Sequence, residues 1–175
     1  MKTLLSLVLL ATLSYSANFT LQSPDLQGQL TNTQEFNGFG CSGKNISPEL
    51  SWSDAPKDTK SFAITMYDKD APTGSGWWHW SLFNIPTSAT SIVPNASRTE
   101  LLPKGAVEGT NDYGLVGFGG ACPPKGDGFH TYVVTVYALD VDKLDLDKNT
   151  NQAVVGYMIN VHTIEKSSVV SYYKR

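Results

Sequence analysis

The chain has 175 residues, a formal charge of −3 and a pI near 5.5. This length suits one domain that buries a core of its own. The acidic balance argues against a nucleic-acid-binding surface, which needs a basic patch. Lysines and arginines are scattered, so no polybasic cluster for anionic lipid is present in the sequence either.

The first 16 residues have the three parts of a secretory signal peptide. A short basic start is followed by an apolar run over residues 4–13, and Ser14 and Ser16 are small residues at the cleavage positions. The run is too short for a transmembrane helix, which needs about 20 apolar residues. The sequence therefore predicts cleavage after Ser16, a mature domain of residues 17–175, and a periplasmic or secreted location.

Short strands separated by turn residues are predicted for most of the mature chain. Residues 61–67, 80–85 and 132–139 alternate in the manner of half-buried strands, and residues 168–173 suit a last strand. Glycine and proline are spread along the chain, which favours one β-rich domain over two joined ones. The expected fold class is mainly β, with antiparallel-rich sheets and one or two short helices near the C-terminus.

The helical pattern runs from about Asn151 to Glu165. Asn149, Thr150 or Asn151 can cap its start. Its apolar face is predicted to consist of Val154, Val155, Met158, Ile159 and His162.

Cys41 and Cys122 are the two cysteines of the chain. In an oxidising compartment such a pair is more often bonded than free. Zinc is a poor alternative, because the pair lacks the neighbouring Cys or His spacing of a four-ligand site. We predict a Cys41–Cys122 disulfide, and the chain-entropy model gives it roughly 4–5 kcal/mol of stabilisation.

Two acidic segments resemble calcium-binding loops only in part. After Asp68-Lys69-Asp70 a proline stands where a ligand is needed, and residues 145–149 are followed by Thr150 at the position that requires glycine. Both segments are predicted to be solvated turns or caps, so no metal site is expected.

Two stretches about fifty residues apart carry most of the chemical information. Residues 68–80 contain Asp68, Asp70 and His79, and residues 123–132 join a proline turn to His130 and Tyr132. Two carboxylates and two imidazoles in one pocket would suit a phosphate or carboxylate group, provided that the fold brings the stretches together.

Each of these residues also has a purely structural explanation. His79, between two tryptophans, is either a neutral core residue with one backbone partner or a ligand-binding group. His130 follows a glycine-rich loop whose amides can meet an anion. Large aromatic residues usually pack the core, but Trp78 directly precedes His79 and is the tryptophan expected to reach a ligand.

Catalysis has less support than binding. The chain lacks a Gly-x-Ser-x-Gly nucleophile elbow, and Ser47 lies in a turn-forming context. A disulfide would leave no free thiol for cysteine catalysis. Two acids and two histidines are still able to perform general acid–base chemistry. We therefore expect a binding pocket and assign no catalytic residue.

The same residues resemble the signature blocks of one family, the phosphatidylethanolamine-binding proteins, also called Raf-kinase-inhibitor-like proteins. The matching blocks are Asp68-x-Asp70-Ala71-Pro72, Trp78-His79-Trp80, Gly128-x-His130-x-Tyr132 and residues 45–52. Residues 74–80 and 119–126 are similar to the bacterial branch, and the signal peptide points to its periplasmic members.

The resemblance implies a β fold with few helices and a small anion-binding pocket. Carried over residue by residue, the pocket is lined by Asp68, His79, Pro123, Pro124, His130 and Tyr132, with Asp70 and Trp78 in support. Related proteins are often cis at the bond matching Ala71–Pro72, so a cis bond is expected here. Thr131 stands where many members have arginine, which implies the loss of a salt bridge that steadies the pocket loop.

The resemblance leaves more than one function open. The first is binding of a small anionic ligand or a phospholipid head group. An alternative is an interaction or inhibitor protein that acts on an extracytoplasmic protein partner, and a weaker one is hydrolysis with His79 or His130 as base. No cofactor, metal or nucleic-acid partner is expected, and a homodimer stays open.

Overall fold

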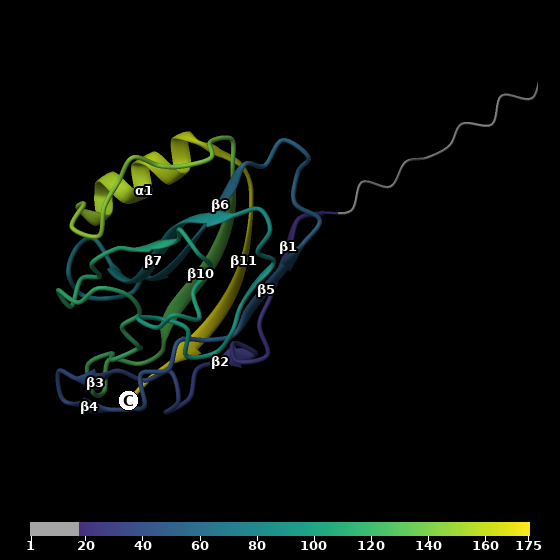
Figure 1. Cartoon of the computed structure of the whole chain (residues 1–175). Coiled ribbons are helices and arrows are strands. Elements are labelled where there is room, and N and C mark those ends of the chain that lie inside the picture. The colour runs from purple at the N-terminus through teal and green to yellow at the C-terminus, as the bar shows by residue number, and fades with distance from the viewer. Residues whose placement is uncertain (1–17) are drawn as a thin grey trace, which may run out of the picture.

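The computed structural model describes residues 18–175, so the predicted signal peptide and its cleavage after Ser16 lie outside the described residues. The described chain is mainly β, with one helix near its end (Figure 1). Its elements are β1 (Thr20–Gln22), β2 (Gly28–Gln29), β3 (Asn37–Gly38), β4 (Cys41–Ser42), β5 (Leu50–Ser53), β6 (Ser61–Asp68), β7 (Trp77–Pro86), β8 (Ser91–Ile92), β9 (Val107–Glu108), β10 (His130–Leu139), α1 (Gln152–Val161) and β11 (Thr163–Tyr173).

The principal sheet has six strands in the order β2-β11-β10-β6-β7-β9. Its long central strands are antiparallel neighbours, and only the short β2 pairs in parallel, with the end of β11. A second sheet of three strands has the order β1-β5-β8, and β3 pairs with β4 in a separate hairpin. The expected mainly β, antiparallel-rich fold is confirmed.

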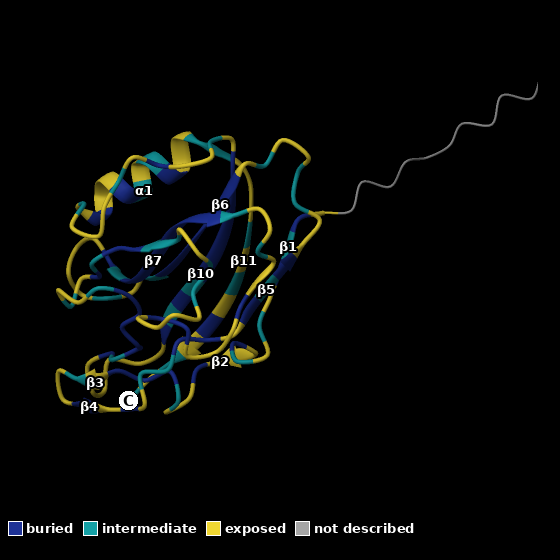
Figure 2. Cartoon of the chain, in the orientation of Figure 1, coloured by how far each residue is buried: buried dark blue, intermediate teal, exposed yellow. Residues whose placement is uncertain are grey.

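The main core lies between the two sheets. Alternate residues of β6, β7 and β10 point toward β1, β5 and β8, and the buried strands appear as dark ribbons in Figure 2. The largest fully buried side chains of this core are Trp80, Tyr132, Phe118, Leu30, Leu50, Ile64, Met66, Leu82, Ile85 and Ile92. Such close-packed apolar burial is the main favourable term in folding, and here it fixes the strands that carry the site.

The helix α1 covers the other face of the principal sheet. The side chain of Asn151 accepts a hydrogen bond from the amide of Ala153 at 2.9 Å, as an N-cap does. Val155 and Ile159 are buried against residues of β6, β7 and β10, whereas Val154 faces solvent. The helix and its capping residue are thus confirmed, but Val154 does not belong to the buried face.

The helix ends at Val161, four residues before the predicted end at Glu165. Thr163 already begins β11, where it pairs with Leu139, and its hydroxyl donates to the carbonyl of Ile159 at 2.7 Å. His162 is the C-cap, and its Nδ1 lies 2.9 Å from an Asp140 carboxylate oxygen, outside the apolar face. A β-branched threonine favours the strand over continuation of the helix.

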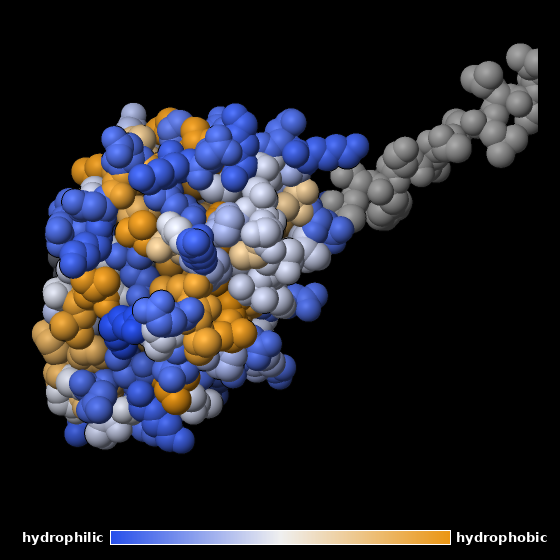
Figure 3. Space-filling model, viewed as in Figure 1, coloured by the Kyte–Doolittle hydropathy of each residue, from blue (hydrophilic) through white to orange (hydrophobic). Residues whose placement is uncertain are grey.

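The surface carries no single apolar face in the view of Figure 3, where hydrophilic residues surround smaller apolar groups. Within residues 18–175, no helix is long and apolar enough to cross a membrane. The same residues hold no cluster of three or more side chains suited to a metal ion.

Candidate functional site: a cavity at the ends of three central strands

A cavity of about 340 Å³ opens where β6 ends and where β7 and β10 begin. Segments far apart in the sequence contribute to its wall, and most of the lining is apolar with a few polar groups. The lining residues are Phe39, Asp68, Ala71, Pro72, Thr73, Trp77, His79, Tyr113, Cys122, Pro123, Pro124, His130 and Arg175. This composition is typical of small-molecule sites.

The strand register explains why the two stretches singled out in the sequence meet. Asp68, the last residue of β6, pairs with Tyr132 of β10 on one side and with Trp77 of β7 on the other. His130 is the first residue of β10. Because the three strands are neighbours in the sheet, the polar residues at their ends lie together at one end of the strands.

A β-bulge in β7 determines which way the side chain of His79 points. Met66 pairs with Trp80 and Tyr67 pairs with Trp78, so His79 is an extra residue without a partner on β6. A bulge of this kind turns a side chain away from strict alternation. It allows Trp80 to remain in the core while His79 lines the cavity.

The imidazole of His79 is held in one tautomer. Its Nδ1 lies 2.7 Å from the carbonyl oxygen of Gly119 and 3.1 Å from that of Gly120. Carbonyl oxygens only accept, so Nδ1 carries a proton and Nε2 is the free acceptor of the neutral ring. Burial lowers the pKa of His79 to about 4, against the opposing effect of the Gly119 carbonyl and the Asp68 charge.

Gly120 makes this arrangement sterically feasible. A Cβ added at Gly120 would lie 2.0 Å from the carbonyl oxygen of Gln34, so only glycine allows the two backbones to approach. The amide of Gly120 donates to Oδ1 of Asn45 at 2.7 Å, which fixes the peptide that holds His79.

His130 differs from His79 in the protonation state that its surroundings favour. Its Nδ1 lies 2.7 Å from Asp68 Oδ2, and its Nε2 lies 3.2 Å from Asp127 Oδ2. Burial opposes a charge on this ring, but the hydrogen bonds and charges of Asp68 and Asp127 outweigh it and raise the pKa of His130. The cavity thus pairs a neutral histidine with one that its carboxylate neighbours favour as a cation.

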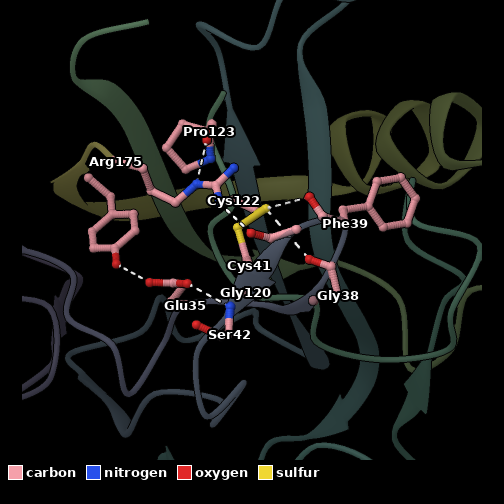
Figure 4. Close-up of a disulfide and its surroundings, with 12 residues drawn as sticks. Glu35, Gly38, Phe39, Cys41, Ser42, Gly120, Cys122, Pro123 and Arg175 are labelled. Carbon is pink, nitrogen blue, oxygen red and sulfur yellow. Dashed lines mark hydrogen bonds between the residues drawn. A yellow bond between two sulfur atoms is a disulfide. The ribbon is translucent and has the colours of Figure 1, made fainter. Parts of the chain in front are cut away.

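The predicted disulfide is confirmed, and it forms part of the cavity wall. Cys41 and Cys122 are bonded, with their Cα atoms 6.0 Å apart, and Cys122 lines the cavity beside Pro123. Figure 4 shows Arg175 beside this bond. Its Nε donates to the Pro123 carbonyl at 2.8 Å and its Nη1 to the Gly40 carbonyl at 2.7 Å, so Arg175 joins the same two segments as the disulfide.

Two predicted aromatic residues, Tyr132 and Trp78, and the unpredicted Trp77 take different positions. Trp77 lines the cavity, and its buried Nε1 has no hydrogen-bond partner within residues 18–175. Tyr132, which was predicted to line the pocket, is fully buried and lies outside the lining; its ring is 5.2 Å from that of His79, and its hydroxyl likewise lacks a partner in the described chain. Trp78 lies outside the lining and packs on Tyr67, with 4.6 Å between ring centroids.

Comparison with known proteins identifies this architecture. A family model described as phosphatidylethanolamine-binding protein matches residues 25–174. The chain belongs to the phosphatidylethanolamine-binding protein family. It is 48% identical over 181 positions to the UPF0098 protein YbcL of Escherichia coli (strain K12), with 99% of each chain covered. It is 42% identical to the UPF0098 protein YbhB of the same organism, over 83% of this chain and 92% of that relative.

Solved structures agree with the family assignment. The crystal structure of Escherichia coli YbcL, described as a new member of the mammalian PEBP family, matches with a TM-score of 0.88 and 49% identity. The match covers 91% of this chain and 99% of YbcL. A phosphatidylethanolamine-binding protein homologue from Chlamydia trachomatis matches with a TM-score of 0.73 and 27% identity, over 90% of this chain and 97% of that one.

Thr131 stands where many family members carry arginine, so the loss of a salt bridge to the pocket loop was expected. Lys69 supplies a cation at this loop instead. Lys69 Nζ lies 2.7 Å from Asp70 Oδ1, and the Thr131 amide donates to Asp70 Oδ2 at 2.8 Å. Hydrogen bonds from Lys69 and Thr131 lower the pKa of Asp70 to about 2. Asp70 therefore still ties the cavity loop to β10, with Lys69 as its cation.

The expected cis bond at Ala71–Pro72 is wrong for this family member, since no peptide bond within residues 18–175 is cis. Other features shape the loop. The amide of Thr73 donates to the Ala71 carbonyl at 2.8 Å, and Gly74 and Gly76 have φ values of 80° and 67°. Glycine adopts this left-handed conformation readily, so the chain turns here without a cis proline.

Sequence reasoning missed Phe39, Trp77, Tyr113 and Arg175 as lining residues. Trp77 stands in the block of residues 74–80, and its place in the lining follows from its pairing with Asp68 across β6 and β7, which only the structure shows. Tyr113 and Arg175 stand in no block that the sequence analysis recognised. They reach the cavity through long-range packing: Tyr113 stacks on Phe36 at 4.0 Å, and Arg175 follows the end of β11.

Proposed function

We propose that the chain is an exported binding protein whose cavity accepts the phosphate-type or carboxylate group of a small anionic ligand or phospholipid head group. Membership of a family described by phosphatidylethanolamine binding supports this proposal. The observation that carries it is the set of unused hydrogen-bonding groups at the cavity. Buried polar atoms are nearly always paired, so those without a partner mark a place where a ligand or water completes the bonding.

Trp77 Nε1 is the unpaired group in the cavity lining, and the hydroxyl of the buried Tyr132, whose ring lies 5.2 Å from that of His79, also lacks a partner within residues 18–175. An indole N–H only donates, so it suits an oxyanion. Burial raises the pKa of Tyr132, so its hydroxyl keeps the proton that it can donate. His130 and Arg175, both in the lining, supply positive charge.

The state of His79 sets a condition on the ligand. Since Nδ1–H is occupied by two carbonyls, Nε2 accepts a hydrogen bond from a protonated ligand oxygen, or takes up a proton to bind an ionised one. The pKa of His79 is lowered to about 4. Affinity for a fully ionised oxyanion should therefore rise as the pH falls toward that value.

Binding is favoured over hydrolysis because the hydroxyl and sulfur groups that could act as nucleophiles in the cavity are already engaged. The Thr73 hydroxyl donates to the Gly76 carbonyl at 2.5 Å, and the sulfur of Cys122 is held in the disulfide. Nucleophilic catalysis needs a hydroxyl or thiol activated by an adjacent base. His130 is engaged on both ring nitrogens by carboxylates, which leaves it no free lone pair to act as a base. His79 keeps a lone pair on Nε2, but within residues 18–175 no side-chain hydroxyl or thiol is hydrogen-bonded to it.

Replacement of His79 tests the binding site. We expect His79→Ala to weaken binding of inorganic phosphate and phosphoethanolamine by about tenfold or more, because truncation of a charge-assisted contact costs on the order of 1.5–3 kcal/mol. Calorimetric titration of the folded variant measures this change. His162→Ala is the matched control, since His162 pairs with Asp140 away from the cavity. Equal affinity in wild type and His79→Ala would remove His79 from the site.

Export is tested separately, on the full-length chain. Expression in Escherichia coli should yield a protein in the periplasmic fraction whose N-terminal residue is Ala17. Mass spectrometry and N-terminal sequencing measure both. An intact Met1 on protein confined to the cytosolic fraction would contradict export, and the pocket proposal would be unaffected.

A further inference from the structure

A second hollow, which we call the basic groove, lies beside the cavity described above. It has a volume of about 730 Å³ and shares no lining residue with the cavity. Lys44 and Arg98 are its charged residues, and the amides of Asn37, Asn45 and Asn95 add further hydrogen-bonding groups. No acidic residue lines it, although the chain as a whole has a net charge of −3.

The guanidinium of Arg98 is held in a fixed position but is not neutralised. Its Nη1 donates to the carbonyl of Phe118 at 2.7 Å and more weakly to that of Val116 at 3.4 Å. Neither Arg98 nor Lys44 forms an ion pair within residues 18–175. Two carbonyl contacts orient the planar guanidinium while its remaining N–H groups stay available, which reduces the entropy lost when an oxyanion binds.

The backbone of the basic groove is held in an unusual conformation. Asn45, Asn95 and Arg98 have φ values of 52°, 59° and 60°. Asparagine tolerates this left-handed region, but arginine adopts it at an energetic cost. Such residues persist where the surrounding structure fixes them, and they cluster at ligand-binding sites.

Glu108, a buried carboxylate bonded to the main chain of Arg98, forms no ion pair with the guanidinium. Glu108 accepts hydrogen bonds from Trp80 Nε1 at 2.8 Å, from the Ser97 hydroxyl at 2.6 Å and from the backbone amide of Arg98 at 2.8 Å. Glu108 therefore fixes the main chain at Arg98 and leaves the side chain directed to the carbonyls of residues 116 and 118.

We propose that the basic groove is a second binding site, which takes a phosphate or carboxylate group of a small ligand between Lys44 and Arg98. The arginine offers a planar fork that matches an oxyanion, and the lysine adds a mobile point charge. The neighbouring asparagine amides and the ring of Phe36 give the rest of the ligand polar and apolar contacts. The volume is in the range of small-molecule clefts.

The basic groove and the cavity share a wall, so a test has to distinguish them. Phe36 lines the groove and stacks at 4.0 Å on Tyr113, which lines the cavity. Oδ1 of Asn45 accepts from the Gly120 amide, and the Gly120 carbonyl in turn contacts His79. A residue-resolved method is therefore needed.

The test is a titration followed by ¹⁵N NMR, with inorganic phosphate in one arm and succinate in the other. Saturable shifts are expected at the amides of Lys44 and Arg98 in the wild type and also in His79→Ala. Lys44→Gln/Arg98→Gln should weaken this response by about tenfold or more, since two charge-assisted contacts are lost. The charge-matched control is Lys57→Gln/Lys60→Gln, on exposed lysines outside the groove.

The single variant Lys44→Gln keeps the test informative if the double variant fails to fold. The Lys44 side chain is exposed and forms no hydrogen bond within residues 18–175, so this variant should fold as the wild type does. A weaker response in Lys44→Gln, with the control unchanged, supports the proposal. Absence of saturable shifts at Lys44 and Arg98 with both ions, or equal shifts in wild type and Lys44→Gln, overturns it. Loss of cavity binding in His79→Ala bears on the cavity alone.

Discussion

Removal of the Cys41–Cys122 disulfide is expected to destabilise the protein by about 4–5 kcal/mol, because the bond closes a loop with a sequence separation of 81 and restricts the unfolded chain. For a domain of this size, that cost corresponds to a fall in melting temperature of roughly 8–20 °C. The measurement is denaturant and thermal unfolding of wild type and of Cys41→Ser/Cys122→Ser, each under non-reducing conditions.

The same variant should bind phosphate more weakly. Cys122 and Pro123 belong to the cavity wall, and the disulfide ties them to the segment around Gly40. Without the bond, the contacts of Arg175 with the Pro123 and Gly40 carbonyls are left to hold that wall. Reduction of the wild-type protein should reproduce both effects. Unchanged affinity in a variant that has lost stability would show that the bond stabilises the fold without ordering the cavity.

Much of the fold could be predicted because its strands have a simple period. β6 and β10 are recognisable from their alternating, β-branched residues, although both strands are buried on both faces over most of their length, between the second sheet and α1. The end of α1 was harder to place. Residues 162–165 suit a helix by spacing, but Thr163 pairs with Leu139, and a cross-strand partner is visible only in the folded chain.

The candidate site was predicted only in part, for a similar reason. Asp68, His79 and His130 stand in recognisable blocks, so their meeting followed from the family resemblance. The bulge that turns His79 toward the cavity depends on the register between β6 and β7, which no local pattern records. Arg175 and Tyr113 reach the wall from distant segments, and long-range packing of this kind leaves no periodic signal in one sequence.

The ion pair between Asp68 and His130 should matter more to stability than any surface charge pair. Both side chains are almost fully buried, and Asp68 also accepts from the Asp70 amide at 2.9 Å. Loss of one partner of a buried pair costs about 3–5 kcal/mol, because the other charge stays buried without compensation. Asp68→Asn is therefore expected to lower the unfolding free energy by about that amount near pH 6, as measured by urea denaturation.

The difference in unfolding free energy between wild type and Asp68→Asn should depend on pH. The folded-state pKa of His130 is raised above its unfolded value, so the stability from its charge is fully present below the unfolded pKa of about 6.5. That contribution is lost as the pH rises through the folded-state pKa, and the gap between wild type and Asp68→Asn should narrow there. Asp140→Asn is the matched control, since Asp140 pairs with His162 at the surface and should cost at most about 1 kcal/mol. A gap for Asp68→Asn no larger than that of the control would show that the buried pair contributes no special stability.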